Sequence, residues 1–118
     1  NQVLIFVRRI QPIFKKLMYD VIVIGGGLAG LVSALELARS GFRVALIERK
    51  TYPFHKVCGE YVSNEVRDYV RTLGVDLPGL GAADVRRFWF TSPSGRSLRA
   101  PLDLGGFGIS RYRLDNEF

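Results

Sequence analysis

The sequence has very few of the residues that form disulfides and metal sites. Its 118 residues include one cysteine, Cys58, one histidine, His55, one methionine and one tryptophan. A single cysteine excludes a disulfide within the chain, which favours a reducing, cytoplasmic setting. One histidine and one cysteine do not supply the common zinc-ligand sets, so we expect no metal site. The longest apolar run, residues 3–7, is far shorter than the ~20 residues of a membrane-spanning helix.

The excess of positive charge is concentrated at the start of the chain. The formal net charge is +6, and residues 1–17 contain two arginines, two lysines and no acidic residue. This leaves +2 for residues 18–118, too little to indicate a nucleic-acid-binding surface. Apolar residues of this leader recur at steps of three and four, the pattern of an amphipathic helix, at Val3, Phe6, Val7, Ile10, Ile13, Phe14 and Leu17. Two interpretations stay open: a helix that docks on a membrane surface or partner, or non-native sequence upstream of Met18.

The pattern that follows is that of one βαβ unit. Residues 20–24 are a short β-branched run that predicts a buried parallel strand. Residues 28–40 predict a helix, and residues 43–47 predict a second strand that leads into Glu48. Strand, helix and strand within about 30 residues form a parallel, right-handed unit by default.

The remainder predicts a loop, a helix, a β-hairpin, an extended segment and the start of a further helix. These occupy residues 49–62, 64–73, 85–101, 105–110 and 113–118. Ser63 is the predicted N-cap of the first of these helices, because its hydroxyl can accept a hydrogen bond from the first turn. The sheet of the βαβ unit has only two clear strands in this pattern, so we expect an incomplete domain.

A glycine motif joins the first strand to the helix. Residues 25–30 satisfy the pattern G-x-G-x-x-G, directly after a predicted strand. Gly25 permits a tight turn, Gly27 lets a pyrophosphate approach the backbone, and Gly30 lets the helix pack closely. Glu48 ends the second strand, where a carboxylate accepts hydrogen bonds from ribose hydroxyls and repels the 2′-phosphate of NADP. With the phosphates at the helix N-terminus, the motif predicts a site for FAD or NAD.

A family resemblance distinguishes between these two cofactors. Residues 19–30, followed by Ile47-Glu48-Arg49, resemble the start of the FAD-dependent oxidoreductases related to p-hydroxybenzoate hydroxylase. Residues 56–60, Lys-Val-Cys-Gly-Glu, resemble the K-x-C-G-E segment of the geranylgeranyl reductase family, and residues 110–115 resemble its later S-R-x-x-L/F-D segment. The resemblance covers residues 18–118. It implies an α/β fold, a Rossmann-type FAD-binding half with the start of an inserted β-hairpin region.

The resemblance also implies which residues contact FAD. They are Gly25, Gly27, Leu28, Ala29 and Gly30 in the glycine loop, Glu48 at the adenosine ribose, Arg49 at the adenine end, Lys56, Cys58 and Gly59 along the path from the pyrophosphate to the isoalloxazine, and Arg111 at the phosphates. No catalytic residue is implied with equal clarity, and Cys58 is expected near the flavin. The organic chemistry would be that of the flavin, with the protein supplying binding and orientation.

Domain organisation and activity follow from the same resemblance. It divides the chain into the leader (1–17), an FAD-binding unit with its following helix (18–84), the start of a substrate-covering sheet (85–110) and the start of a return helix (111–118). It implies an NAD(P)H-linked flavin oxidoreductase that reduces double bonds of a prenyl or other lipid-like substrate. The alternatives are an FAD-dependent monooxygenase of a small or aromatic substrate and an inert truncated dinucleotide-binding module. We expect little turnover by residues 1–118 alone. Peripheral membrane contact would come from the leader.

Overall fold

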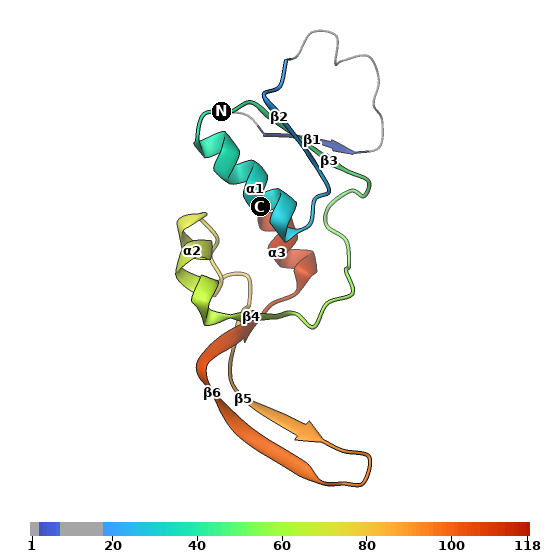
Figure 1. Cartoon of the computed structure of the whole chain (residues 1–118), viewed down its shortest axis with the longest axis vertical. Helices are drawn as coiled ribbons and strands as arrows, with labels where there is room; N and C mark the ends of the chain where they lie inside the picture. Colours follow the sequence, from blue (N-terminus) through green and yellow to red (C-terminus); the bar gives the residue numbers. More distant parts are fainter. Residues whose placement is uncertain (1–2, 8–17) are drawn as a thin grey trace. The chain divides into compact units, whose positions relative to one another are not determined.

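The computed structural model describes residues 3–7 and 18–118 (Figure 1). The chain forms two compact units: one runs up to Phe54 and includes Phe118, and the other spans residues 55–117. Within the described part of the chain, no helix is long and apolar enough to cross a membrane.

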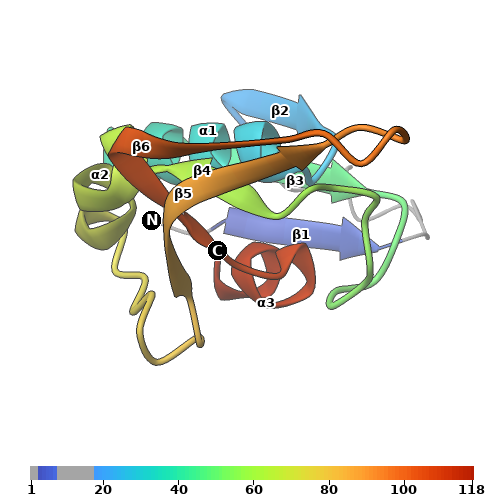
Figure 2. The same ribbon diagram turned by 90° about the horizontal axis from the view of Figure 1, so that it is seen from below.

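The first unit is a parallel sheet with a helix packed on it. Its strands are β1 (Val3–Val7), β2 (Val21–Ile24) and β3 (Val44–Glu48), in the order β1-β3-β2, and the helix is α1 (Leu28–Arg39). Both outer strands pair with β3 in parallel, and the arrows of β1 and β2 point the same way in Figure 2. The predicted strand, helix and strand are therefore confirmed.

The core of this unit lies between α1 and β3. Leu31, Ala34 and Ala38 of the helix pack against Val44 and Leu46, and all five side chains are buried. Burial of such apolar area contributes roughly 25 cal/mol per Å², and the small residues let the helix approach the sheet closely.

Strand β2 is partly buried, and on one face only. Val21 and Val23 pack against the core, whereas Ile22 and Ile24 are 53% and 83% exposed. The prediction of a strand buried on both faces is therefore wrong for half of its residues. The reason is that α1 is the helix of this unit and covers a single face, whereas full burial of a parallel strand needs cover on both.

The leader also departs from its prediction. Residues 3–7 form β1 instead of the first turns of an amphipathic helix, with Val3 opposite Val44 and Val7 opposite Glu48. The run Val-Leu-Ile-Phe-Val is rich in β-branched residues, and the free edge of β3 offers it a row of backbone partners. The rest of the predicted helix, residues 8–17, lies outside the described residues.

An ion pair joins the starts of β2 and β3. The Arg43 backbone N–H donates to Asp20 at 2.8 Å, and its guanidinium donates to both carboxylate oxygens at 3.0 and 2.7 Å. These hydrogen bonds lower the pKa of Asp20 from 3.8 to about 2. Because folding lowers this pKa, the stabilisation is complete above about pH 4 and is lost as the pH falls toward 2.

We therefore expect Asp20→Asn to melt at a lower temperature than the wild type at neutral pH, with the difference shrinking between pH 4 and pH 2. Thermal unfolding followed by circular dichroism from pH 2 to pH 7 measures this. A difference that stays constant down to pH 2 would show that the carboxylate charge does not stabilise the strand ends.

The second unit is an antiparallel sheet with short helices. Its strands are β4 (Tyr61–Ser63), β5 (Ala83–Thr91) and β6 (Ser97–Gly108), in the order β4-β6-β5. Between β4 and β5 lie the 3-10 turn η2 (Asn64–Val66) and helix α2 (Arg67–Thr72), and after β6 comes α3 (Arg111–Glu117). The Ser63 hydroxyl accepts a hydrogen bond from the Glu65 N–H at 3.4 Å, which confirms the predicted N-cap.

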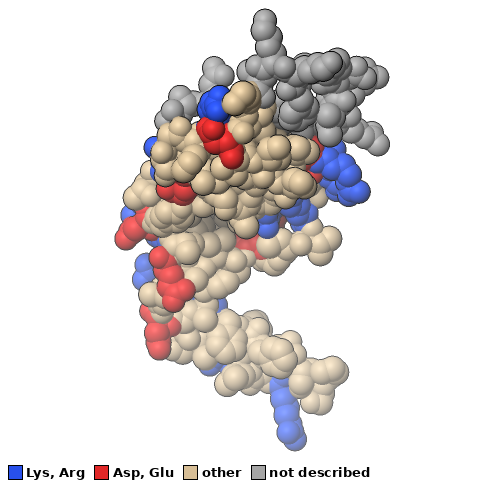
Figure 3. Space-filling model, turned by 45° about the horizontal axis from the view of Figure 1, so that its top comes forward, with Lys and Arg blue, Asp and Glu red and all other residues tan. Residues whose placement is uncertain are grey.

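The β-hairpin is confirmed, but two of its details differ from prediction. Strand β6 runs unbroken through residues 102–104, where the sequence predicted a gap, and β4 begins within the predicted loop and ends at Ser63, the predicted N-cap. The hairpin tip lies beyond the rest of the sheet. Residues 85–102 contain four arginines and no acidic residue, and in Figure 3 the lower end of the molecule carries blue side chains on a tan surface.

Candidate nucleotide-binding site

The glycine loop joins β2 to α1 and is tied to β3. The Gly25 N–H donates to the Ile47 carbonyl at 2.8 Å, which holds the loop at the carboxyl end of the sheet. Gly25 has φ +102, a conformation that side-chain-bearing residues rarely adopt, so the predicted tight turn is present. A Cβ at Gly30 would lie far inside van der Waals distance of the Gly25 carbonyl oxygen. The close helix packing predicted for Gly30 is therefore present too.

Gly27 differs from the other two glycines of the motif. Its φ of −74 and ψ of 175 are open to any residue, and a Cβ there would have no described atom within 4 Å. Neither backbone conformation nor packing within the described residues requires glycine at this position. The position thus offers open space next to the start of α1.

The start of α1 fits an anionic group. Its cap residue, Gly27, supplies no side-chain hydrogen bond, and its first turn contains no acidic residue. The first intrahelical bond of this region runs from the Leu31 N–H to the Gly27 carbonyl at 2.9 Å. The N–H groups of Leu28 and Ala29 belong to the first turn, where helix geometry provides no intrahelical acceptor. Together with the helix dipole, they favour negative charge.

Glu48 ends β3 beside the loop, as predicted. One carboxylate oxygen accepts the Gly26 N–H at 2.8 Å, and the other accepts the Lys50 N–H at 2.9 Å. A carboxylate oxygen can accept more than one hydrogen bond, so these contacts do not preclude hydrogen bonds from ribose hydroxyls. Arg49 follows Glu48 and is exposed. The residues of this unit therefore fit the adenosine and phosphate parts of a dinucleotide.

Tyr52 contacts the glycine loop, which the sequence pattern did not predict. Its hydroxyl donates a hydrogen bond to the Gly26 carbonyl, and its ring packs against the core of the first unit. The ring also lies 5.3 Å from that of Phe54, measured between centroids. No sequence pattern marks this contact, because it joins residues that are 26 positions apart.

In the second unit, a buried carboxylate brings two predicted site residues together. Asp115 is 3% exposed, and its oxygens accept hydrogen bonds from Lys56 at 2.5 Å and from the Arg111 guanidinium at 2.6 and 2.9 Å. The hydrogen bonds to Asp115 raise the pKa of Arg111, and a smaller contribution comes from Cys58. Lys56 and Arg111 thus share one anion.

Cys58 and Gly59 lie in the exposed stretch beside this cluster. The Cys58 sulfur accepts the Glu60 N–H at 3.4 Å, and the thiol is exposed. A Cβ at Gly59 would meet no described atom within 4 Å. Within the part of the chain that the structure describes, no group of three or more His, Cys, Asp or Glu residues is placed to hold a metal ion.

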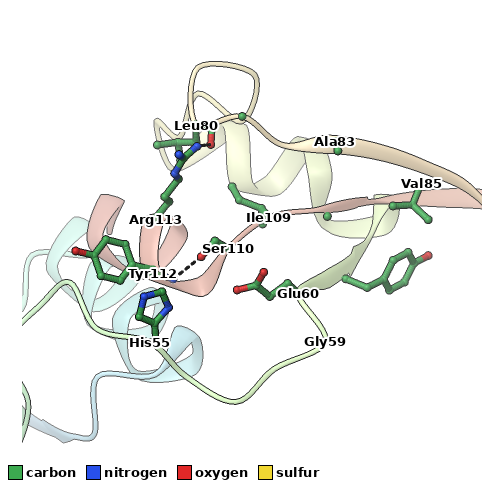
Figure 4. Close-up of a pocket in the computed structure, with 13 residues that line it drawn as sticks. His55, Gly59, Glu60, Leu80, Ala83, Val85, Ile109, Ser110, Tyr112 and Arg113 are labelled. Carbon is green, nitrogen blue, oxygen red and sulfur yellow. Dashed lines mark hydrogen bonds between the residues drawn. The ribbon is translucent and has the colours of Figure 1, made fainter.

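The second unit also contains a pocket of about 810 Å³ (Figure 4). At one end, the His55 ring stacks on Tyr112 with centroids 4.7 Å apart. The Arg113 guanidinium reaches the Leu80 carbonyl at 3.0 Å, and the Glu60 carboxylate accepts the Arg111 N–H at 3.2 Å. The sequence did not predict this pocket, because its walls come from three segments, residues 55–61, 80–85 and 108–113.

Comparison with known proteins gives a family match for part of the chain. Residues 20–56 match the family described as FAD dependent oxidoreductase. Conditioned medium factor receptor 1 of Dictyostelium discoideum is 40% identical over 85 residues, which cover 69% of this chain and 16% of that protein. Digeranylgeranylglycerophospholipid reductase of Sulfolobus acidocaldarius is 33% identical over 104 residues, which cover 75% of this chain and 22% of that protein.

A solved structure shows the same fold. The 2,6-dihydroxypyridine-3-hydroxylase of Arthrobacter nicotinovorans superposes with a TM-score of 0.64 at 22% identity, over 85% of this chain and 25% of that one. The chain spans about a fifth of the length of the curated relatives it matches. Residues 20–56 thus match the FAD dependent oxidoreductase family, within a chain that is similar to geranylgeranyl reductases over most of its length.

Proposed function

We propose that the complete protein is an NAD(P)H-linked flavin oxidoreductase that holds FAD in the loop of residues 25–30 and reduces double bonds of a prenyl or other lipid-like substrate. The observation that carries the FAD part is the open space at Gly27, where a Cβ would meet no described atom. A glycine that neither the backbone nor the packing requires is explained by a ligand that approaches the backbone there.

Different residues of the first unit would bind different parts of FAD. The N–H groups at the start of α1 would bind the phosphates, and Glu48 would accept the ribose hydroxyls. Bound FAD supplies electron and hydride transfer, which protein side chains do not. Lys56 and Arg111 would contribute positive charge, and Cys58 would lie along the path to the flavin. Asp115 accepts hydrogen bonds from both cations, so it would hold their side chains in one orientation.

The substrate class is taken from the relatives. The Sulfolobus protein is named as a digeranylgeranylglycerophospholipid reductase, which favours a prenyl or lipid-like substrate here. The hydroxylase is below 25% identity and indicates only the shared fold, so it does not favour a monooxygenase. Product analysis separates the two: a reductase adds hydrogen to the substrate without O₂, whereas a monooxygenase consumes O₂ and adds a hydroxyl. We expect turnover to need the complete polypeptide, since these residues span about a fifth of the relatives.

The first test is the absorbance spectrum of the complete polypeptide purified from cells. We expect flavin bands in the wild type and their loss in Gly27→Glu, because the added carboxylate would fill the open space and repel the phosphates. The backbone at Gly27 admits a side chain, so the variant is expected to fold. Ser94→Glu, in the exposed hairpin turn, adds the same charge and is expected to keep the flavin. A colourless wild type that takes up no added FAD would contradict the proposal.

A further inference from the structure

The peptide planes of the glycine loop are held from two sides by side chains. The Gly26 N–H donates to Glu48 at 2.8 Å, and the Gly26 carbonyl accepts a hydrogen bond from the Tyr52 hydroxyl. Gly26 itself is buried. A Cβ at this position would overlap the Tyr52 hydroxyl oxygen and would lie 3.0 Å from the ring carbon that bears it. Tyr52 therefore lies directly against the second glycine of the motif.

The Tyr52 hydrogen bond determines the direction of a neighbouring donor. The carbonyl of Gly26 and the N–H of Gly27 belong to one planar trans peptide, so they point in opposite directions. With its carbonyl held by Tyr52, this peptide directs the Gly27 N–H away from the Tyr52 ring. Gly27 is the N-cap residue of α1, so its N–H is one of the backbone donors at the N-terminus of the helix.

Tyr52 is itself well anchored. Its ring is half-buried and packs against the cluster formed by α1 and β3. An anchored ring holds its hydroxyl in one place, which a flexible side chain would not do. The hydroxyl that donates to the Gly26 carbonyl is thus held in place by the packing of its ring.

We propose that Tyr52 is a positioning residue for FAD, whose hydroxyl fixes the Gly26–Gly27 peptide so that the Gly27 N–H faces the phosphates. This inference rests on the proposed function. The residue makes no contact with the ligand in this scheme and acts only through the loop. Removal of the hydroxyl would free the peptide to rotate, and the ligand would have to reorder it on binding.

The direct test is the dissociation constant for FAD of the complete polypeptide, after removal and titration of the flavin. Tyr52→Phe keeps the ring in the core and removes only the hydroxyl, so we expect binding to weaken by about two- to tenfold, the worth of one hydrogen bond. Tyr69→Phe, which removes a hydroxyl from α2 in the other unit, is the matched control and should leave the constant unchanged. Equal FAD affinity of Tyr52→Phe and the wild type would overturn the proposal.

A second measurement uses rescue to test the contact between Tyr52 and the loop. Gly26→Ala should bind FAD poorly, because its Cβ overlaps the Tyr52 hydroxyl. Adding Tyr52→Phe removes the overlapping oxygen and should restore part of the affinity. Gly27→Ala, whose Cβ meets no described atom, should not be rescued. Failure of Tyr52→Phe to improve Gly26→Ala, or equal improvement of Gly27→Ala, would contradict the proposed geometry.

The unfolding temperatures of the flavin-free variants separate this inference from the proposed function. If the wild type binds no FAD, the proposed function and the role of Tyr52 toward FAD both fail. The rescue of Gly26→Ala by Tyr52→Phe in flavin-free protein then still shows whether the loop contact exists. If the wild type binds FAD and Tyr52→Phe does not rescue Gly26→Ala, only the inference on Tyr52 fails.

Discussion

Gly30→Ala is expected to abolish FAD retention and to lower the free energy of unfolding by about 1–3 kcal/mol or more. The added Cβ would overlap the Gly25 carbonyl oxygen and lie 3.1 Å from its carbon. This neighbour is backbone, so it cannot rotate away as a side chain would. Relief requires the helix to move away from the sheet or the loop to change its path. Either movement displaces the N–H groups at the start of α1.

Gly27→Ala provides the matched comparison. Its backbone angles suit alanine, and no described atom lies within 4 Å of the added carbon. We expect it to unfold like the wild type and to bind FAD more weakly, since the methyl group would occupy the space at which the phosphates approach. Chemical denaturation gives the free energy of unfolding of each variant, and FAD titration gives the dissociation constant of each. Equal stability of Gly30→Ala and Gly27→Ala would contradict the role of Gly30 in helix packing.

These glycines indicate how much of the site could be predicted from the sequence. A motif that follows a strand and begins a helix places Gly25 and Gly30 through local geometry, and the second predicted strand places Glu48 at its end; the structure has all three there. Tyr52 could not be found in this way. Its contact with Gly26 depends on the path of the segment after β3, which carries no periodic pattern.

In the fold, too, local elements were predictable from the sequence and tertiary contacts were not. The helix α1 and the strands beside it follow from long periodic runs and a glycine stop, which are the strongest local signals. The leader was predicted to be helical, and that prediction is wrong for residues 3–7, a short apolar run that suits a strand as well as a helix. Pairing with β3 decides the outcome, and only tertiary structure reveals that partner.

Strand β6 illustrates a misleading local signal. The predicted hairpin ended at Pro101, and proline lacks the N–H that a central strand needs. However, β4 pairs only with residues 106–108, so at Pro101 the strand β6 has one neighbour, β5. The ladder is also irregular next to this point, between Val85 and Arg87. Proline is tolerated at such an edge beside a bulge.

The buried carboxylate of the second unit carries the other large predicted effect. Asp115→Ala is expected to lower the free energy of unfolding by about 3 kcal/mol, because it leaves two cations without their shared anion in a poorly hydrated site. The side chains of Lys56 and Arg111 are only 19% and 16% exposed, so water cannot fully replace the carboxylate. Asp115→Asn keeps the shape and one acceptor oxygen, and we expect a smaller loss.

Asp68→Ala is the control for the charge change. Asp68 pairs with Arg71 at 3.2 Å, but its side chain is 93% exposed, so its removal should change stability by less than about 0.5 kcal/mol. Urea unfolding of the three variants measures the differences. A loss below about 1 kcal/mol for Asp115→Ala would mean that Lys56 and Arg111 find water or other partners without cost.

The same variants also test the connection between this cluster and the proposed cofactor site. Under the proposed function, Asp115 fixes Lys56 and Arg111, which lie 55 residues apart in the sequence, in one direction. If these cations bind FAD, Asp115→Asn should weaken FAD binding even under conditions where the variant is fully folded. Unchanged FAD affinity in folded Asp115→Asn would restrict the cluster to joining the segment before β4 to α3. In that case the phosphates would be bound by the glycine loop alone.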